Sequence, residues 1–121
     1  MKIAIPADDK NIDSTVCQSF GRTPYFLTYD TETETAEYID NSAASSQGGA
    51  GIKAAQAIVD SKVSAILTLR CGQNAAEVLT AAGILIYKTE STSVKENIAA
   101  FKENRLSQLQ EIHAGFHGHG G

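Results

Sequence analysis

The two cysteines are the softest metal ligands in this chain, and each stands where a strand-like run gives way to a turn. Cys17 lies within VCQSFGRTPYF (16–26), and Cys71 lies within LTLRCGQNAAEVL (67–79). A thiolate is a good ligand for copper, zinc and iron–sulfur units, but two thiolates complete neither a tetrahedral site nor a cluster. The pair therefore predicts either a site for a cluster that brings its own sulfides, which two chains could share, or two small buried hydrophobes.

Two of the three arginines lie beside these cysteines. Arg22 follows Cys17 in the same loop, and Arg70 directly precedes Cys71. A metal–sulfur cluster is usually anionic, and guanidinium groups attract an anion and donate hydrogen bonds to it. We therefore take Cys17 and Cys71 as candidate metal ligands on exposed loops, with Arg22 and Arg70 as charge partners that face the same space. The alternative is that the arginines are ordinary surface cations.

Glycines stand ahead of two helical patterns. Gly48 and Gly49 open the run GGAGIKAA, and Gly72 opens GQNAA. Free backbone N–H groups at a helix N-terminus can hold an anion. Neither run is a nucleotide loop, because the Gly-Lys-Ser/Thr of a P-loop is missing. The alternative is that these glycines allow a helix to pack closely against a sheet.

All of the histidines lie near the end of the sequence, at His113, His117 and His119. Their imidazoles could bind a transition metal weakly, as weaker candidates than the cysteines, or the segment could take no part in a site. An acidic loop at 8–13 has no histidine at a telling spacing, so we interpret its carboxylates as solvated rather than catalytic.

Length and composition narrow the class of protein. The chain has 121 residues, of which 42% are hydrophobic, which fits one domain. The net charge of −4 argues against a nucleic-acid partner. No apolar run approaches the roughly 20 residues of a membrane span, and no signal-peptide pattern stands out. We expect a cytoplasmic protein with reduced thiols and no membrane partner.

Strand patterns occupy 2–7, 25–30, 35–40, 63–69 and 84–88, and a helical pattern follows each of the last three. Three strands in a row favour antiparallel hairpins, and β–α alternation favours parallel crossovers. The order predicts an α/β fold with a mixed five-stranded sheet, ordered 3-2-1-4-5, and helices on both faces.

This strand order makes the first and fourth strands parallel neighbours. The loops that carry Cys17 and Cys71 would then leave the same end of the sheet, where α/β proteins bind ligands. The loop after the third strand, at 45–51, would form another wall of that cleft. We expect residues 91–93 to cap the third helix with Glu96 in a capping box. We expect that helix to be extended by Leu106, Leu109 and Ile112. We divide the chain into a domain at 1–104 and a tail at 105–121, which is partly helical and then rich in glycine and histidine.

Four stretches carry a resemblance to a known family: MKIAIP (1–6), SFGRTPYFLTYD (19–30), IDNSAASSQGGAGIKAAQ (39–56) and LTLRCGQNAAEVLTAAGILIYK (67–88). They resemble the small NifX/NifB-like proteins of the dinitrogenase iron–molybdenum cofactor biosynthesis family over about residues 1–104. The resemblance implies a ribonuclease H-like three-layer fold and a protein that binds or carries a metal–sulfur cluster or its precursor. Many relatives have a histidine just before Phe-Gly-Arg, where this chain has Ser19, so Cys17 and Cys71 become the natural substitutes.

The residues expected around the cluster come from the three loops. They are Cys17, Ser19, Phe20, Gly21, Arg22, Gly48, Gly49, Arg70, Cys71 and Gly72.

Two functions follow. The first is a non-catalytic carrier or scaffold for an iron–sulfur or molybdenum-containing cluster, a monomer or weak homodimer whose partner is a cluster donor or acceptor protein. The second is a regulatory or protein-interaction module without bound metal, in which the cysteines only pack.

Overall fold

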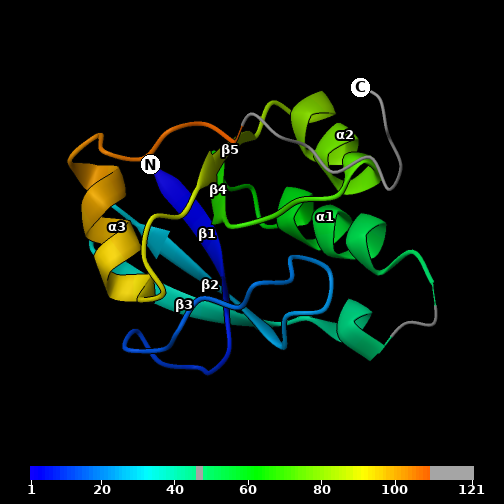
Figure 1. Ribbon diagram of the computed structural model, residues 1–121, viewed down its shortest axis with the longest axis horizontal. Helices are drawn as coiled ribbons and strands as arrows, with labels where there is room; N and C mark the ends of the chain where they lie inside the picture. The colour runs from blue at the N-terminus through cyan, green and yellow to red at the C-terminus, as the bar shows by residue number, and fades with distance from the viewer. Residues whose placement is uncertain (46–47, 110–121) are drawn as a thin grey trace.

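One mixed sheet forms the centre of the protein, with helices on both of its faces (Figure 1). The computed structural model describes residues 1–45 and 48–109. The sheet has five strands in the order β3-β2-β1-β4-β5, which confirms the order predicted from the sequence. The strands are β1 (Lys2–Ala7), β2 (Tyr25–Asp30), β3 (Thr35–Asp40), β4 (Ala65–Thr68) and β5 (Leu85–Lys88).

The pairing follows the alternation of elements along the chain. β2 is antiparallel to both β1 and β3, with Ile5 opposite Leu27 and Leu27 opposite Tyr38. β1 and β4 are parallel neighbours, and β4 is parallel to β5. The carboxyl ends of β1 and β4 therefore meet at one end of the sheet, as the sequence predicted.

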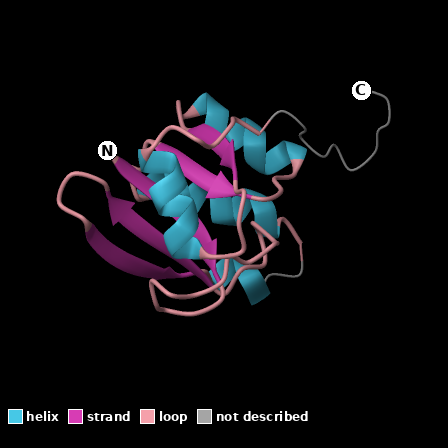
Figure 2. Cartoon of the chain, turned by 60° about the vertical axis from the view of Figure 1, so that its left-hand side comes forward, coloured by secondary structure: helices cyan, strands magenta, loops and turns pink. Residues whose placement is uncertain are grey.

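The two faces of the sheet are covered by different helices (Figure 2). The helices α1 (Ala50–Asp60) and α2 (Gln73–Ala81) bury residues such as Ile58 and Leu79 on one face. The helix α3 (Val94–Lys102) buries Val94 and Ile98 on the other face. A short 3-10 helix, η1 (Ser42–Ser45), lies between β3 and α1.

The N-terminus of α3 is capped within 91–93 as the sequence predicted, but the expected capping box is not formed, because the N–H of Ser93 donates to the hydroxyl of Ser91 and not to Glu96. Ser93 is the N-cap residue, and its Oγ accepts a hydrogen bond from the N–H of Glu96 at 3.1 Å. The carboxylate of Glu96 in turn accepts a hydrogen bond from the hydroxyl of Ser91 at 2.7 Å. The Ser93 hydroxyl thereby satisfies one N–H group that the first turn of the helix leaves open.

The end of α3 differs from the prediction. The helix stops at Lys102, and Asn104 adopts a left-handed backbone with φ of 59°. The chain then lies along β5, where Lys88 N–H donates to the carbonyl of Ser107 and Leu109 N–H donates to the carbonyl of Ile86, both at 2.8 Å. The expected helical continuation is therefore wrong for 105–109, because the open edge of β5 offers backbone partners to an extended segment. Ile112 lies outside the described residues.

Within the part of the chain that the structure describes, no helix is long and apolar enough to cross a membrane.

Candidate functional site

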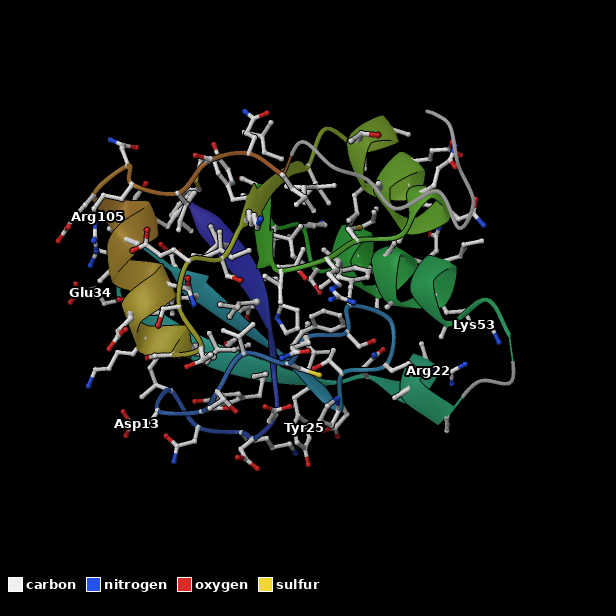
Figure 3. All side chains as sticks on the ribbon, viewed as in Figure 1. Asp13, Arg22, Tyr25, Glu34, Lys53 and Arg105 are labelled. Atoms are coloured by element: carbon white, nitrogen blue, oxygen red, sulfur yellow. The ribbon has the colours of Figure 1, made fainter. Side chains whose placement is uncertain are left out.

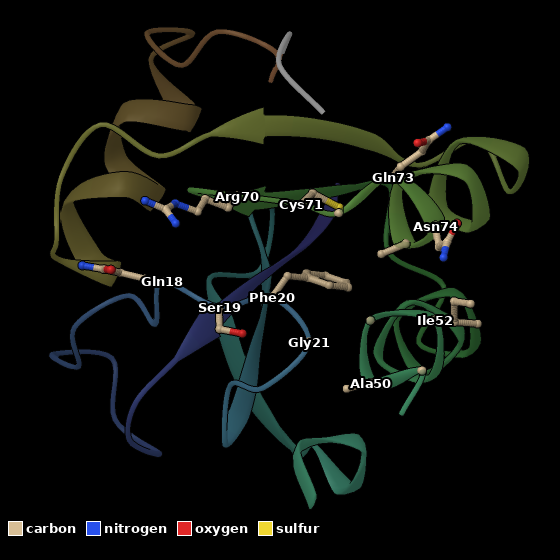
Figure 4. Close-up of a pocket in the computed structure, with 14 residues that line it drawn as sticks. Gln18, Ser19, Phe20, Gly21, Ala50, Ile52, Arg70, Cys71, Gln73 and Asn74 are labelled. Carbon is tan, nitrogen blue, oxygen red and sulfur yellow. The ribbon is translucent and has the colours of Figure 1, made fainter. Parts of the chain in front are cut away.

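A pocket of about 720 Å³ opens at the carboxyl ends of β1 and β4 (Figure 4). Three segments line it: the loop after β1 at 18–21, the entry to α1 at 49–52, and the turn from β4 into α2 at 70–75. These are the three walls that the sequence predicted for a cleft. The predicted site residues that line it are Ser19, Phe20, Gly21, Gly49, Arg70, Cys71 and Gly72.

The first wall is held against the sheet by Phe20 and against α1 by Gly21. The ring of Phe20 is buried and lies 5.3 Å from that of Phe26, centroid to centroid. A Cβ at Gly21 would come within 3.0 Å of the backbone nitrogen of Gly51 and 3.1 Å of its Cα. Only a glycine allows the loop to approach the start of α1 this closely.

Two buried polar side chains fix the same loop from behind. The side-chain amide of Asn41 donates to the carbonyls of Gly21 and Thr23 at 3.0 and 2.9 Å. The hydroxyl of Thr23 lies 3.1 Å from the carbonyl of Ala7 and 2.9 Å from that of Tyr25. Neither Asn41 nor Thr23 was predicted, because both stand among turn-forming residues and no sequence signal marks them as buried.

The starts of α1 and α2 both face the pocket without side-chain caps. Their N-cap residues are Gly49 and Gly72, and neither helix has a side-chain hydrogen bond at its cap. The first-turn N–H groups of an α-helix have no acceptor within the helix, and the helix dipole places partial positive charge there. Among residues 1–45 and 48–109, Ser93 caps α3 but no side chain caps α1 or α2, so the first-turn amides of these two helices can donate to a ligand.

The charge of the pocket is opposite to that of the protein as a whole. The chain has 14 acidic and 10 basic residues, yet the described residues that line the pocket include Arg70 and no Asp or Glu. Arg70 is exposed, and within residues 1–45 and 48–109 no hydrogen bond or ion pair engages its guanidinium. Figure 4 shows Arg70 and Gln18 along one side of the pocket, with Ile52 and Asn74 on the other. The arrangement favours an anionic ligand.

Cys71 lines the pocket from within the core. Its side chain is 1% exposed and packs in the same cluster as Phe20 and Ala75, which corrects the expectation of an exposed loop cysteine. Burial raises the pKa of the Cys71 thiol to about 11, because desolvation disfavours the thiolate. At neutral pH this group is therefore a protonated thiol.

Other predicted residues lie outside the pocket lining. Cys17 is half-buried, and its N–H donates to the carbonyl of Pro6 at 3.1 Å. The guanidinium of Arg22 donates to the carbonyl of Ala44 at 3.0 Å, so it lies beside η1 (Figure 3). The expectation that Arg22 and Arg70 face one space is therefore wrong. Gly48 precedes the lining segment of α1.

The described residues contain no group of three or more His, Cys, Asp or Glu that could hold a metal ion. His113, His117 and His119 lie outside them. Metal ligation by Cys17 and Cys71 stays a prediction.

Comparison with known proteins relates this chain to a family. Residues 1–104 match the sequence model of the dinitrogenase iron-molybdenum cofactor family. An uncharacterized protein of Methanocaldococcus jannaschii is 32% identical over 113 residues, which cover 91% of this chain and 92% of the relative.

Two solved structures are similar over most of their length. The apo form of the orange protein from Desulfovibrio gigas has a TM-score of 0.86 and 32% identity, and the match covers 90% of this chain and 92% of that one. A candidate NifB protein from Thermotoga has a TM-score of 0.80 and 38% identity, with 92% and 95% covered.

Proposed function

This chain belongs to the dinitrogenase iron–molybdenum cofactor family, and from that premise we propose that it carries an anionic metal–sulfur cluster or cluster precursor in the pocket. It acts as a carrier or scaffold in the cytoplasm and not as a catalyst. One observation carries the proposal: two helix N-termini without side-chain caps and Arg70 converge on a pocket whose described lining residues include no carboxylate. The implied ribonuclease H-like name for the fold belongs to the same proposal.

Backbone amides are the main donors to the cargo in this proposal. The first turn of α1 offers the N–H groups of 50–52, and the first turn of α2 offers those of 73–75. Hydrogen bonds from N–H groups to an anion are stronger than neutral ones, and sulfide or oxide groups on a cluster would accept them. Arg70 adds a full positive charge at one side of the pocket.

The state of Cys71 indicates what kind of cargo suits the pocket. Deprotonating this thiol at neutral pH costs roughly 5 kcal/mol, since its pKa is about 11 and each pH unit corresponds to about 1.4 kcal/mol. A cluster that needs protein thiolates has to offset this cost through its metal–sulfur bonds. A species with a complete sulfur shell of its own does not, so a thiomolybdate-like precursor fits the pocket well.

A cargo held by hydrogen bonds and charge can be released without breaking a metal–protein bond. The protein partner that this requires is a donor or acceptor of the cluster.

Anaerobic loading with tetrathiomolybdate tests the proposal. After desalting, the wild type should retain molybdenum, and Arg70→Gln should retain at least about tenfold less, since losing a charge-assisted contact costs roughly 1.5–3 kcal/mol. Arg105→Gln is the matched control, because Arg105 is exposed and paired with Glu90 and Glu103.

The cysteines are tested in the same experiment. Cys17→Ser and Cys71→Ser should each lose retention if the thiols are ligands, and equal retention would remove both from the site. If the wild type retains no molybdenum or iron–sulfur species, the better hypothesis is a regulatory or protein-interaction module without bound metal.

A further inference from the structure

The first wall of the pocket contains a peptide group that is held at both of its ends, the one between Gly21 and Arg22. Its carbonyl oxygen accepts a hydrogen bond from the side-chain amide of Asn41 at 3.0 Å, and its N–H donates to Oγ of Ser19 at 3.0 Å. Ser19 and Gly21 line the pocket (Figure 4), whereas Asn41 is not among the described residues that line it. The carbonyl oxygen is therefore bonded to a group outside the pocket.

The direction of this peptide decides whether the wall attracts or repels an anion. In a trans peptide the carbonyl and the N–H point in opposite directions. A carbonyl oxygen turned into the pocket would repel an anion, whereas an N–H or a hydroxyl donates to it. The bond to Ser19 uses an acceptor site of the hydroxyl and leaves its hydrogen as a donor. With the Gly21 carbonyl held by Asn41, the wall presents donors, as the starts of α1 and α2 do.

Gly21 by itself would let this peptide rotate. Rotation changes ψ of Gly21, and a residue without a Cβ permits a wide range of backbone angles. A larger residue cannot remove that freedom, because a Cβ at Gly21 would come within 3.0 Å of the backbone nitrogen of Gly51. The restraint on the peptide therefore has to come from a tertiary contact.

Asn41 is built to supply that contact. Its side chain is 7% exposed, and its amide donates to the carbonyl of Thr23 at 2.9 Å as well as to that of Gly21. Its backbone N–H donates to the carbonyl of Pro24 at 3.0 Å. A buried hydrogen bond is electrostatically stronger than one in water, so these bonds hold the loop carbonyls on the side of Asn41.

We infer that Asn41 is a positioning residue of the pocket, which keeps the first wall a donor surface by holding the Gly21 carbonyl away from the bound anion. It does so without touching the cargo. The consequence for binding rests on the proposed function, whereas the direction of the peptide does not.

Asn97 provides the matched control. It is a second buried asparagine, and its side-chain amide donates to the carbonyls of Ser91 and Ser93 at 2.7 and 2.8 Å. None of these three residues is among the described residues that line the pocket. The Asn97 side chain also accepts from two backbone N–H groups, so Asn97→Ala should destabilise the protein at least as much as Asn41→Ala.

NMR relaxation of backbone amides in the cargo-free protein measures how firmly the peptide is held. The order parameter of the Arg22 amide should be about 0.85 in the wild type and in Asn97→Ala, and below about 0.6 in Asn41→Ala. Equilibrium binding of tetrathiomolybdate should be at least about tenfold weaker in Asn41→Ala, the lower end of what the loss of a supporting partner costs at metal sites. Asn97→Ala should bind as the wild type does. If Asn41→Ala does not fold, Asn41→Ser keeps a hydroxyl in the buried site and should change both quantities in the same direction.

An Arg22 amide that stays ordered without the Asn41 side chain would overturn the inference. Equal affinity of Asn41→Ala and a binding-competent wild type would overturn it too, as would equal weakening in Asn41→Ala and Asn97→Ala. If the wild type binds no tetrathiomolybdate, the proposed function fails, and the relaxation data alone decide whether Asn41 holds the peptide.

Discussion

An aspartate at the start of α2 should make the protein more stable and a poorer binder at the same time. Gly72 is the N-cap residue of α2, with an extended backbone at φ −68° and ψ 159°, and a Cβ built there meets nothing within 4 Å. Gly72→Asp therefore fits without strain. Its carboxylate can accept from a first-turn N–H and face the positive end of the helix dipole, which together should raise the free energy of unfolding by about 0.5–1 kcal/mol.

The same carboxylate should repel the proposed cargo. Two unit charges 4 Å apart interact by about 4 kcal/mol at the effective dielectric of a protein surface, and screening by solvent at the open rim lowers this to about half. A penalty of about 2 kcal/mol weakens binding about thirtyfold. The variant also occupies an amide that would otherwise donate to the anion.

Gly72→Asn is the matched control, because it caps the helix without a charge. Urea denaturation measures stability, and equilibrium binding of tetrathiomolybdate followed by visible absorption measures affinity. We expect both variants to be at least as stable as the wild type, and Gly72→Asp to bind much more weakly than Gly72→Asn. Equal affinity of Gly72→Asp and the wild type would refute the assignment of the anion to the start of α2.

Three further predictions concern stability. Burial raises the pKa of Cys71 from 9.0 to about 11, so the stability that its protonated thiol contributes is fully present below pH 9 and is lost as the pH rises through 11, by up to about 3 kcal/mol. The urea midpoint should therefore fall more steeply between pH 8 and 11 in the wild type than in Cys71→Ser, and parallel curves would contradict this. Lys62 follows α1 and Gly83 follows α2, and both have a left-handed backbone, with φ of 61° and 80°. Lys62→Gly should therefore stabilise the protein and Gly83→Ala should destabilise it, each by about 1 kcal/mol. Melting temperatures that shift in the same direction in both variants would be inconsistent with backbone strain. Gly21→Ala should cost about 1–3 kcal/mol and lower cargo retention, because its Cβ meets the backbone of α1; Gly48→Ala, with open space around its Cβ, is the control that should change neither.

The sequence by itself determined the sheet. Strands are recognised by apolar patterns over a few residues, and three of them in a row followed by β–α alternation leave few ways to connect them. The order 3-2-1-4-5 and the meeting of three loops at one end followed from that pattern. The cap at Ser93 was predictable for the same reason, because its partners lie within a few residues of it.

Only the tertiary structure decided which side chains face the pocket. Cys17 and Cys71 stand in similar local sequences, yet Cys71 is buried against Phe20, which is far away in the chain, and Cys17 does not line the pocket. The guanidinium of Arg22 donates to the carbonyl of Ala44 and does not line the pocket with Arg70, and no local sequence pattern predicts that contact. The physical reason is that a side chain's burial, charge state and direction depend on neighbours that the fold brings together, whereas strand and helix patterns depend on neighbours along the chain.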